Sequence, residues 1–89
     1  MIQKFLDYIA IEKRYSQHTI ISYKKDLQDF SQFIASHYPE NTLLEVNKKQ
    51  IRTFIIDLSK KEINKRSINR KLSSLRSFYL YLLKIGFIE

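Results

Sequence analysis

A stretch near the end of the chain combines arginines and serines on one side of a predicted helix. Within SINRKLSSLRSFYLYL, residues 67–82, a period of 3.6 residues separates an apolar stripe from a polar side. Serine is a mediocre helix former, so a face that meets only water would more often carry Glu, Lys or Ala. Serines let a helix backbone approach another surface closely, and their hydroxyls, like guanidinium groups, hydrogen-bond phosphates and base edges. The polar side, which predicts contact with nucleic acid, comprises Arg66, Arg70, Ser73, Ser74 and Ser77.

The charge of the chain favours the same class of partner. Its 89 residues include 16 Lys and Arg and nine Asp and Glu, which gives a net charge of +7. The excess lies in the second half, because residues 47–88 hold eleven basic and two acidic side chains, whereas residues 1–46 hold five and six. Polyanions are the natural partners of such a surface, with nucleic acid favoured over an anionic membrane.

The residue types that perform catalysis or bind metals do not form a recognisable motif. His18 and His37 have a spacing that does not suit one metal ion, and no carboxylate cluster accompanies either. The only glycine, Gly86, excludes a glycine-rich phosphate loop, and the six tyrosines lack a surrounding cluster of Arg and His. The absence of cysteine excludes disulfides and thiolate metal sites, and fits a reducing compartment. We therefore expect no catalytic residue, metal, cofactor or small-molecule substrate.

The N-terminal segment MIQKFLDYIAIEK does not have the features of a targeting signal. It carries acids within its apolar run and has no cleavage site of small residues, so it predicts neither a signal peptide nor a membrane span. We expect a cytoplasmic protein that does not associate with membranes.

The distribution of turn residues predicts an all-α domain of four helices. One Gly, one Pro and long segments with helical periodicity leave little room for a sheet. We expect helices over residues 1–13 and 17–36, a third from Asn47 to the KKEINKR loop at 60–66, and a fourth over 67–84. Ser16 and Asn47 are suitable N-caps, and Gly86 suits a helix C-cap.

Each predicted helix has one apolar side, and these sides should form the core. On the second helix a polar side lies opposite, and Ile21 interrupts it. That polar side comprises His18, Ser22, Lys25 and Asp29. In chain order, the predicted core positions are Ile2, Phe5, Leu6, Ile9, Ile20, Tyr23, Leu27, Phe30, Ile34, Ile51, Phe54, Ile55, Leu58, Ile68, Leu72, Leu75, Tyr79 and Leu82.

Two segments together resemble the N-terminal core-binding domain of tyrosine recombinases, the phage integrase family, and are most similar to its Xer-type members. They are SQHTIISYKKDL, residues 16–27, and SINRKLSSLRSFYLYL, residues 67–82. The resemblance covers nearly the whole chain. It implies a SAM-like domain, a four-helix orthogonal bundle that forms one half of a C-shaped clamp around duplex DNA. It also implies that the second and fourth helices face the DNA, in or beside the major groove.

The resemblance implies DNA contacts by residues that are largely those on the predicted polar sides. For Lys71 and Arg76, which border the apolar stripe, pairing with an acid remains an alternative to DNA contact. Thr19 could hydrogen-bond the helix N-terminus as well as a phosphate. The positions matched to the family are His18, Thr19, Ser22 and Lys25 on the second helix and Arg66, Ser67, Arg70 and Ser74 on the fourth, to which the helical pattern adds Ser73 and Ser77.

Members of this family continue into a larger catalytic domain, whose tyrosine becomes linked to a DNA phosphate. We therefore expect residues 1–89 to be the N-terminal domain of a longer recombinase, and expect this piece not to cut or rejoin DNA. The resemblance implies three partners: duplex DNA, the parent's own catalytic domain, and other recombinase subunits that assemble as a tetramer on paired sites. Two other classes stay open, namely a protein-interaction module without DNA binding and, less favoured, a peripheral membrane protein.

Overall fold

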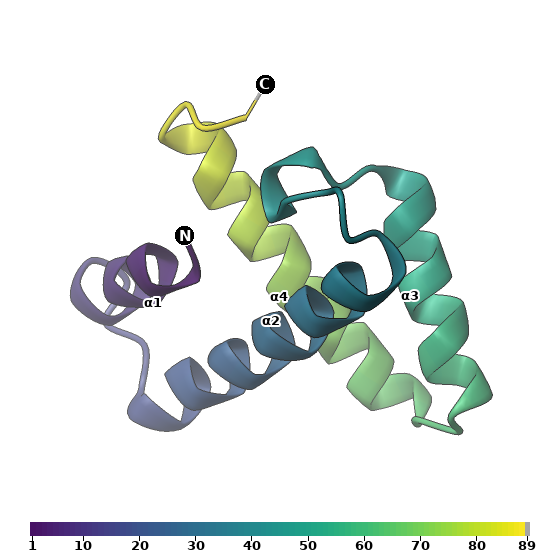
Figure 1. Cartoon of the computed structure of the whole chain (residues 1–89). Coiled ribbons are helices and arrows are strands. Elements are labelled where there is room, and N and C mark those ends of the chain that lie inside the picture. Colours follow the sequence, from purple (N-terminus) through teal and green to yellow (C-terminus); the bar gives the residue numbers. More distant parts are fainter. Residues whose placement is uncertain (89) are drawn as a thin grey trace.

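The structure, a computed structural model, describes residues 1–88, and these are helical throughout apart from short connections (Figure 1). The elements are α1 (Ile2–Ile11), α2 (Gln17–His37), the 3-10 turn η1 (Leu43–Glu45), α3 (Lys48–Lys60) and α4 (Lys65–Lys84). The described residues contain no strand. The prediction of an all-α domain with four helices is therefore confirmed.

Side-chain caps begin α2 and α3 at the predicted residues. Ser16 Oγ accepts a hydrogen bond from the Thr19 amide at 3.3 Å. Asn47 and Gln50 form a capping box, in which each side chain accepts from the other residue's amide, at 3.0 and 3.1 Å. These bonds satisfy amides that the first turn of a helix leaves without partners.

Two helix boundaries differ from the prediction. The first helix ends at Ile11, and the chain turns away at Arg14, which has a φ of 54°. The fourth helix begins before Ser67, because the Asn64 side chain accepts from the Ser67 amide at 2.8 Å and caps the helix there. Asn64 has the right chemistry for a cap but lies inside the charged KKEINKR run, whose composition predicts a loop.

Both α3 and α4 end in a Schellman motif, which needs a residue in the left-handed conformation. After α4 that residue is Gly86, with a φ of 80°, which confirms its predicted role as a C-cap signal. After α3 it is Glu62, with a φ of 62°. There the Glu62 amide donates to Ser59 O at 3.0 Å and the Ile63 amide donates to Leu58 O at 3.1 Å. A side chain makes this conformation unfavourable, and glycine removes that penalty.

Glu62→Gly should therefore stabilise the domain, by about 0.5–1 kcal/mol after allowing for the larger unfolded-state entropy of glycine. Thermal unfolding followed by circular dichroism should show a rise in Tm of about 4 °C. Glu62→Ala is the matched control, because it removes the same charge but keeps the strained conformation. If the two variants had equal Tm values, the strain at Glu62 would not be the cause.

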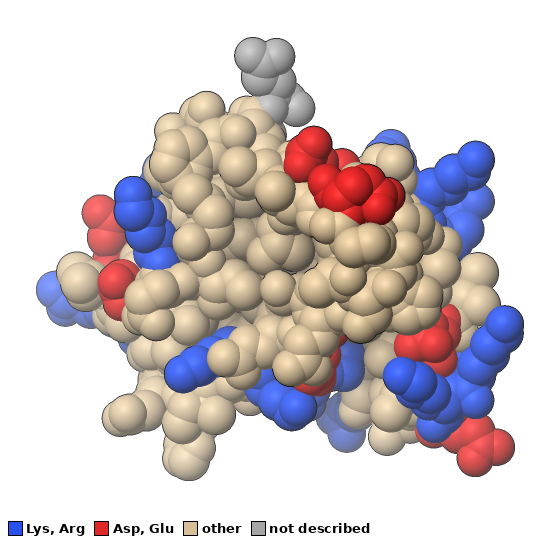
Figure 2. Space-filling view, viewed as in Figure 1, with Lys and Arg blue, Asp and Glu red and all other residues tan. Residues whose placement is uncertain are grey.

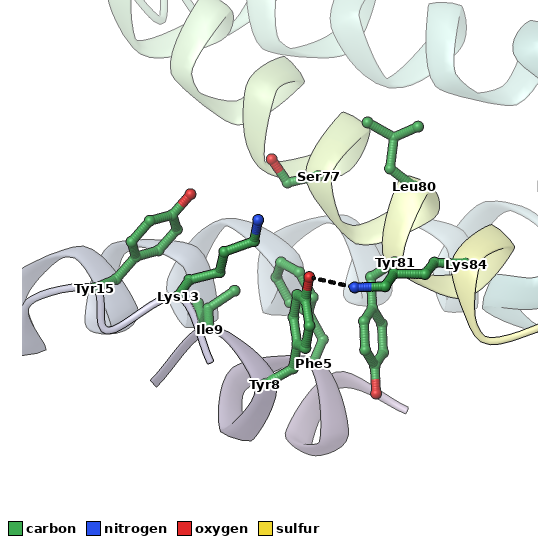
Figure 3. Close-up of a pocket in the computed structure, with 9 residues that line it drawn as sticks. All are labelled: Phe5, Tyr8, Ile9, Lys13, Tyr15, Ser77, Leu80, Tyr81 and Lys84. Atoms are coloured by element: carbon green, nitrogen blue, oxygen red, sulfur yellow. Dashed lines mark hydrogen bonds between the residues drawn. The ribbon is translucent and has the colours of Figure 1, made fainter. Parts of the chain in front are cut away.

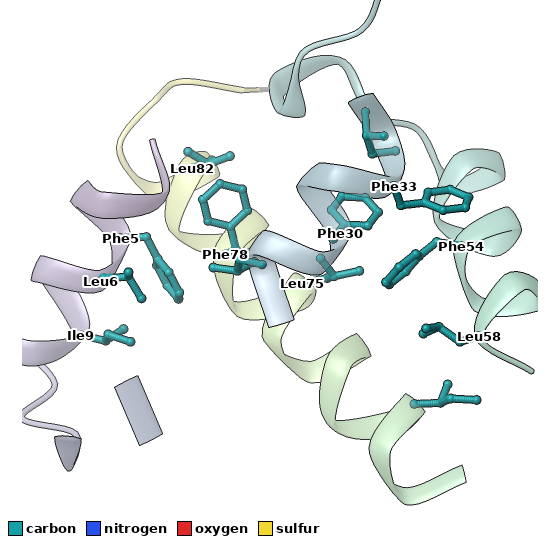
Figure 4. Close-up of a cluster of buried hydrophobic side chains, with 13 residues drawn as sticks. Phe5, Leu6, Ile9, Phe30, Phe33, Phe54, Leu58, Leu75, Phe78 and Leu82 are labelled. Carbon is teal, nitrogen blue, oxygen red and sulfur yellow. The ribbon is translucent and has the colours of Figure 1, made fainter. Parts of the chain in front are cut away.

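The core extends along the whole molecule because α2 and α4 cross at its centre and contact each other and both outer helices (Figure 1). Figure 4 shows side chains of α1 on one side of this crossing and side chains of α3 on the other. The rings of Phe5 and Phe78 meet edge to face at 5.6 Å, and those of Phe30 and Phe54 at 5.1 Å. The buried apolar residues are Phe5, Leu6, Ile9, Leu27, Phe30, Phe33, Ile34, Phe54, Leu58, Ile68, Leu75, Phe78 and Leu82.

Phe33 and Phe78 belong to this core although the predicted stripes omit them. Each lies on a helix that packs against three others, so the buried arc of that helix is wider than one stripe.

The molecule measures 36 × 28 × 17 Å. One helix with its side chains is about 10–12 Å across, so the shortest dimension of the molecule has room for fewer than two full helix diameters. Helices α2 and α4 therefore each keep one side in solvent.

Candidate nucleic-acid interface

A buried carboxylate lies where α2 meets α4. Asp26 is 1% exposed and accepts four hydrogen bonds from α4. Arg70 donates two of them, from Nε to Oδ2 at 3.2 Å and from Nη2 to Oδ1 at 2.9 Å. Ser74 Oγ donates at 2.8 Å and Lys71 Nζ at 3.3 Å. A buried charge is tolerated only when it is paired and hydrogen-bonded in this way.

Further polar contacts continue along the line between the two helices. Asp29 accepts from Lys71 Nζ and from Lys25 Nζ, both at 3.0 Å. Partial burial would raise the pKa of Asp29, but the hydrogen bonds and charges of Lys25 and Lys71 outweigh it and hold this pKa below its ordinary value. We call the connected set of Lys25, Asp26, Asp29, Arg70, Lys71 and Ser74 the polar seam. Within residues 1–88, no buried side-chain nitrogen or oxygen lacks a hydrogen-bond partner.

The polar seam lies between the exposed polar sides of the two helices, and we take these two sides together as one candidate surface. The Arg70 side chain is 52% exposed while its guanidinium contacts Asp26. Asp26 is one turn along α2 from Ser22 and next to Lys25 in sequence, and both of these are exposed. We call this surface the α2–α4 face and define it by the exposed residues His18, Ser22, Lys25, Arg66, Arg70 and Ser73.

Basic side chains lie around the edges of the face seen in Figure 2. In this view Lys and Arg lie mainly along the lower edge and on the side of α3, whereas the centre of the view is largely uncharged. This distribution agrees with the excess of basic residues in the second half of the chain.

Four of the predicted contact residues are less exposed than the helical pattern indicated. Ser74 is 4% exposed and donates to Asp26, so the expectation that it faces outward is wrong. Ser77 is half-buried and its hydroxyl lies 3.4 Å from that of Tyr23. Thr19 and Ser67 are also half-buried, and Thr19 Oγ1 lies 3.0 Å from the N-cap oxygen of Ser16. For Ser74 and Ser77 the cause is α2, which covers the side of α4 that carries them.

Asp26 itself does not appear among the residues predicted from the sequence, although a signal for it exists. It falls three residues after Tyr23 and four before Phe30, on the side of α2 that faces the core. A carboxylate at such a position requires a partner from another element. Lys71, for which the sequence left two alternatives, pairs with Asp26 and Asp29 and is nearly buried.

The histidines and acids of residues 1–88 include no group of three that could hold a metal ion. His18 is exposed, and the ring of His37 stacks on Phe33 at 4.1 Å, with Nδ1 3.1 Å from the Phe33 carbonyl oxygen. Across the same residues, no helix combines the length and the apolar character needed to span a membrane.

A pocket lies between α1 and the end of α4 (Figure 3). This shallow pocket of about 230 Å³ has mainly aromatic and aliphatic walls. Lys84 Nζ donates to Tyr8 Oη at 3.2 Å, and this bond raises the pKa of Lys84 above its ordinary value. The polar groups that line the pocket are those of lysines, tyrosines and one serine.

The chain is similar to one known protein family and to curated proteins that share one name. Residues 2–86 match the family model of the phage integrase N-terminal SAM-like domain. Tyrosine recombinase XerC of Lacticaseibacillus casei (strain BL23) is 36% identical over 88 residues, which cover 99% of this chain and 30% of that protein. XerC of Leptospira interrogans (strain Fiocruz L1-130) is 43% identical over 88 residues, 98% of this chain and 28% of that protein. XerC of Anoxybacillus flavithermus (strain WK1) is 41% identical over 80 residues, 90% of this chain and 26% of that protein.

The chain thus spans less than a third of the length of these curated relatives. No solved structure gives a significant match. The family match, over residues 2–86, includes all four α-helices and every residue of the polar seam. By its sequence and its helical architecture, the chain belongs to the phage integrase N-terminal SAM-like domain family.

Proposed function

We propose that this domain binds duplex DNA through the α2–α4 face, as the DNA-binding part of a site-specific tyrosine recombinase. The observation that carries the proposal is the half-exposed side chain of Arg70, whose guanidinium is held by Asp26 beside the exposed polar side of α2. Arg in such a setting is suited to phosphates and to guanine. The relatives are XerC tyrosine recombinases, which supports the proposed class of the parent protein.

The positions of several other cations support the proposal. The first turns of α3 and α4 carry Lys48, Lys49, Lys65 and Arg66 and no acid. Helix dipoles make N-termini positive, so each cation placed there is unfavourable by about 0.3–1 kcal/mol in the absence of a partner. Phosphate groups reverse that balance, since both the dipole and the side chains then attract the ligand. These placements suit a polyanionic partner better than an unliganded domain.

In this proposal the domain captures and orients DNA, and the parent protein performs strand cleavage and rejoining through a tyrosine in a separate catalytic domain. Diffuse attraction by the lysines precedes insertion of the α2–α4 face in or beside the major groove. Ser22 and Ser73 have little bulk, and the exposed His18 side chain can rotate, so that the two helices can approach the DNA closely. Thr19, Ser67 and Ser77 would contribute from half-buried positions, whereas Ser74 serves Asp26. Assembly with further recombinase subunits and a cytoplasmic location are part of the same proposal.

Arg70→Ala should weaken binding to duplex DNA by about 5- to 150-fold, equivalent to about 1–3 kcal/mol, because it removes a charged contact. Fluorescence anisotropy with a labelled duplex would measure the change. Arg76→Ala is the matched control, since Arg76 is an exposed arginine of α4 outside the α2–α4 face. Equal losses in both variants, or none in Arg70→Ala, would exclude Arg70 from the DNA contact.

A protein-interaction module is the second candidate, favoured by apolar side chains that solvent reaches at the α1 and α4 ends. Ile11 is 74% exposed and Leu80 is 59% exposed. A stable dimer at micromolar concentration, seen by sedimentation, together with no binding of duplex DNA, would favour this function over the first.

A further inference from the structure

We infer that Asp26 is a positioning residue for DNA recognition, because it fixes the orientation in which the α2–α4 face presents Arg70. The inference rests on the proposed function, since it takes duplex DNA to be the ligand of Arg70. It assigns a role in recognition to a side chain that is itself 1% exposed and cannot touch DNA.

The geometry of the pair determines which part of Arg70 remains available. Nε and Nη2 both donate to Asp26, so one edge of the planar guanidinium is occupied. Two bonds through one edge fix both the plane and the rotation of the group. The group still offers both hydrogens of Nη1 and one hydrogen of Nη2. Arg70 can therefore make a fork only through its Nη1–Nη2 end, to one guanine or one phosphate.

Asp26 can position Arg70 because Asp26 is itself held. Ser74 donates to Oδ2 at 2.8 Å and Lys71 to Oδ1 at 3.3 Å, and both of these donors are buried. Buried groups thus hold the carboxylate in one orientation. The carboxylate in turn holds the exposed side chain of Arg70 in one orientation. A flexible arginine would lose its conformational freedom on binding, whereas Arg70 has largely lost it before DNA arrives.

The charge of Asp26 supports a role in orientation over a role in affinity. A carboxylate beneath a surface that meets phosphates repels them. The polar seam holds two acids, Asp26 and Asp29, against three bases, Lys25, Arg70 and Lys71. Replacing Asp26 by a neutral residue would raise the net charge near the DNA. If attraction alone mattered, this replacement would improve binding to every duplex.

Asp26→Asn separates orientation from attraction, because it keeps the shape of the side chain and removes its charge. Wild-type protein would first select a preferred sequence from short duplexes with a randomised centre. Affinities would then be measured for that duplex and for a scrambled duplex of the same composition. We expect the ratio of the two affinities to fall by about tenfold in Asp26→Asn, through loss of one oriented contact. Affinity for the scrambled duplex should stay the same or rise slightly.

The double variant Asp26→Asn/Arg70→Ala tests whether Asp26 acts through Arg70. Its affinity ratio should equal that of Arg70→Ala alone, because Asp26 has nothing to position once Arg70 is gone. Arg70→Lys gives a second route if Asp26→Asn does not fold, as judged by circular dichroism. It keeps the charge but cannot form the fork to Asp26, and its ratio should fall to a similar extent.

The outcomes distinguish the inference from the proposed function. Equal losses for both duplexes in Asp26→Asn would mean a purely structural role, and an unchanged ratio would mean no role in recognition. Either result, or an unchanged ratio in Arg70→Lys, would overturn the inference and leave the DNA-binding function intact. A wild-type protein that binds no duplex would overturn the proposed function, and the inference with it.

Discussion

Asp26→Ala should lower the free energy of unfolding of this domain by about 3 kcal/mol. The substitution removes the acceptor of all four bonds that α4 donates to Asp26 and leaves a small cavity at the α2–α4 contact. Breaking one partner of a buried ion pair commonly costs about 3–5 kcal/mol. We expect the lower end, because Arg70 can turn to water and Lys71 keeps its bond to Asp29.

Thermal and urea unfolding followed by circular dichroism would measure this loss. For a domain of this size, about 3 kcal/mol corresponds to a fall in Tm of about 12–24 °C. Asp7→Ala is the control, since Asp7 is an exposed aspartate whose side chain accepts a hydrogen bond from Gln3, one turn away. It should change stability by no more than about 0.5 kcal/mol. If both variants unfolded at the same urea concentration, the polar seam would not hold α2 against α4.

Binding to duplex DNA should weaken about 500-fold when monovalent salt rises from about 50 mM to about 200 mM. Neutralising about five phosphates releases condensed counterions and gives a slope between about −4 and −5 in a plot of log affinity against log salt. The number five is close to the number of exposed cations on the α2–α4 face and around the turn between α3 and α4. These are six, namely Lys25, Lys60, Lys61, Lys65, Arg66 and Arg70.

A titration series at several salt concentrations would give this slope. Arg66→Ala should reduce its magnitude by about 1, because one phosphate contact is lost. Lys4→Ala should leave the slope unchanged, since Lys4 is exposed on α1, away from the face. An affinity that does not respond to salt would contradict the electrostatic mechanism and favour the protein-interaction alternative.

These two predictions concern different properties of the α2–α4 face. The exposed cations supply attraction, which any duplex can satisfy. The polar seam supplies the fixed geometry of the two helices and of Arg70, on which discrimination between duplexes depends. Salt should therefore act mainly on the attraction to any duplex. Substitution of Asp26 should act mainly on stability and on discrimination between duplexes.

The helix starts and most of the core positions were predictable because they depend on residues close in sequence. Ser16 and Asn47 bond to amides three residues away, so their capping role does not require knowledge of the rest of the fold. Apolar side chains at helical spacing must face inward wherever a helix packs. The boundary at Asn64 was missed only because a charged run concealed a cap of the same kind.

The polar side of α4 was harder to predict from its own residues. Helical spacing groups Ser74 with Arg70, yet Ser74 is buried against Asp26 while Arg70 reaches solvent. The difference arises from the direction in which α2 crosses α4, which no local pattern specifies. For the same reason Phe33 and Phe78, outside the predicted stripes, are core residues.

By itself, then, the sequence determined four amphipathic helices, the capped starts of α2 and α3 and a basic second half, because each of these depends on neighbouring side chains and on composition. Only the tertiary structure decided that Asp26 would meet Arg70, Lys71 and Ser74, which follow it by more than forty residues. Contacts between residues so far apart depend on how α2 and α4 pack, since a buried carboxylate is stable only where the fold brings donors to it.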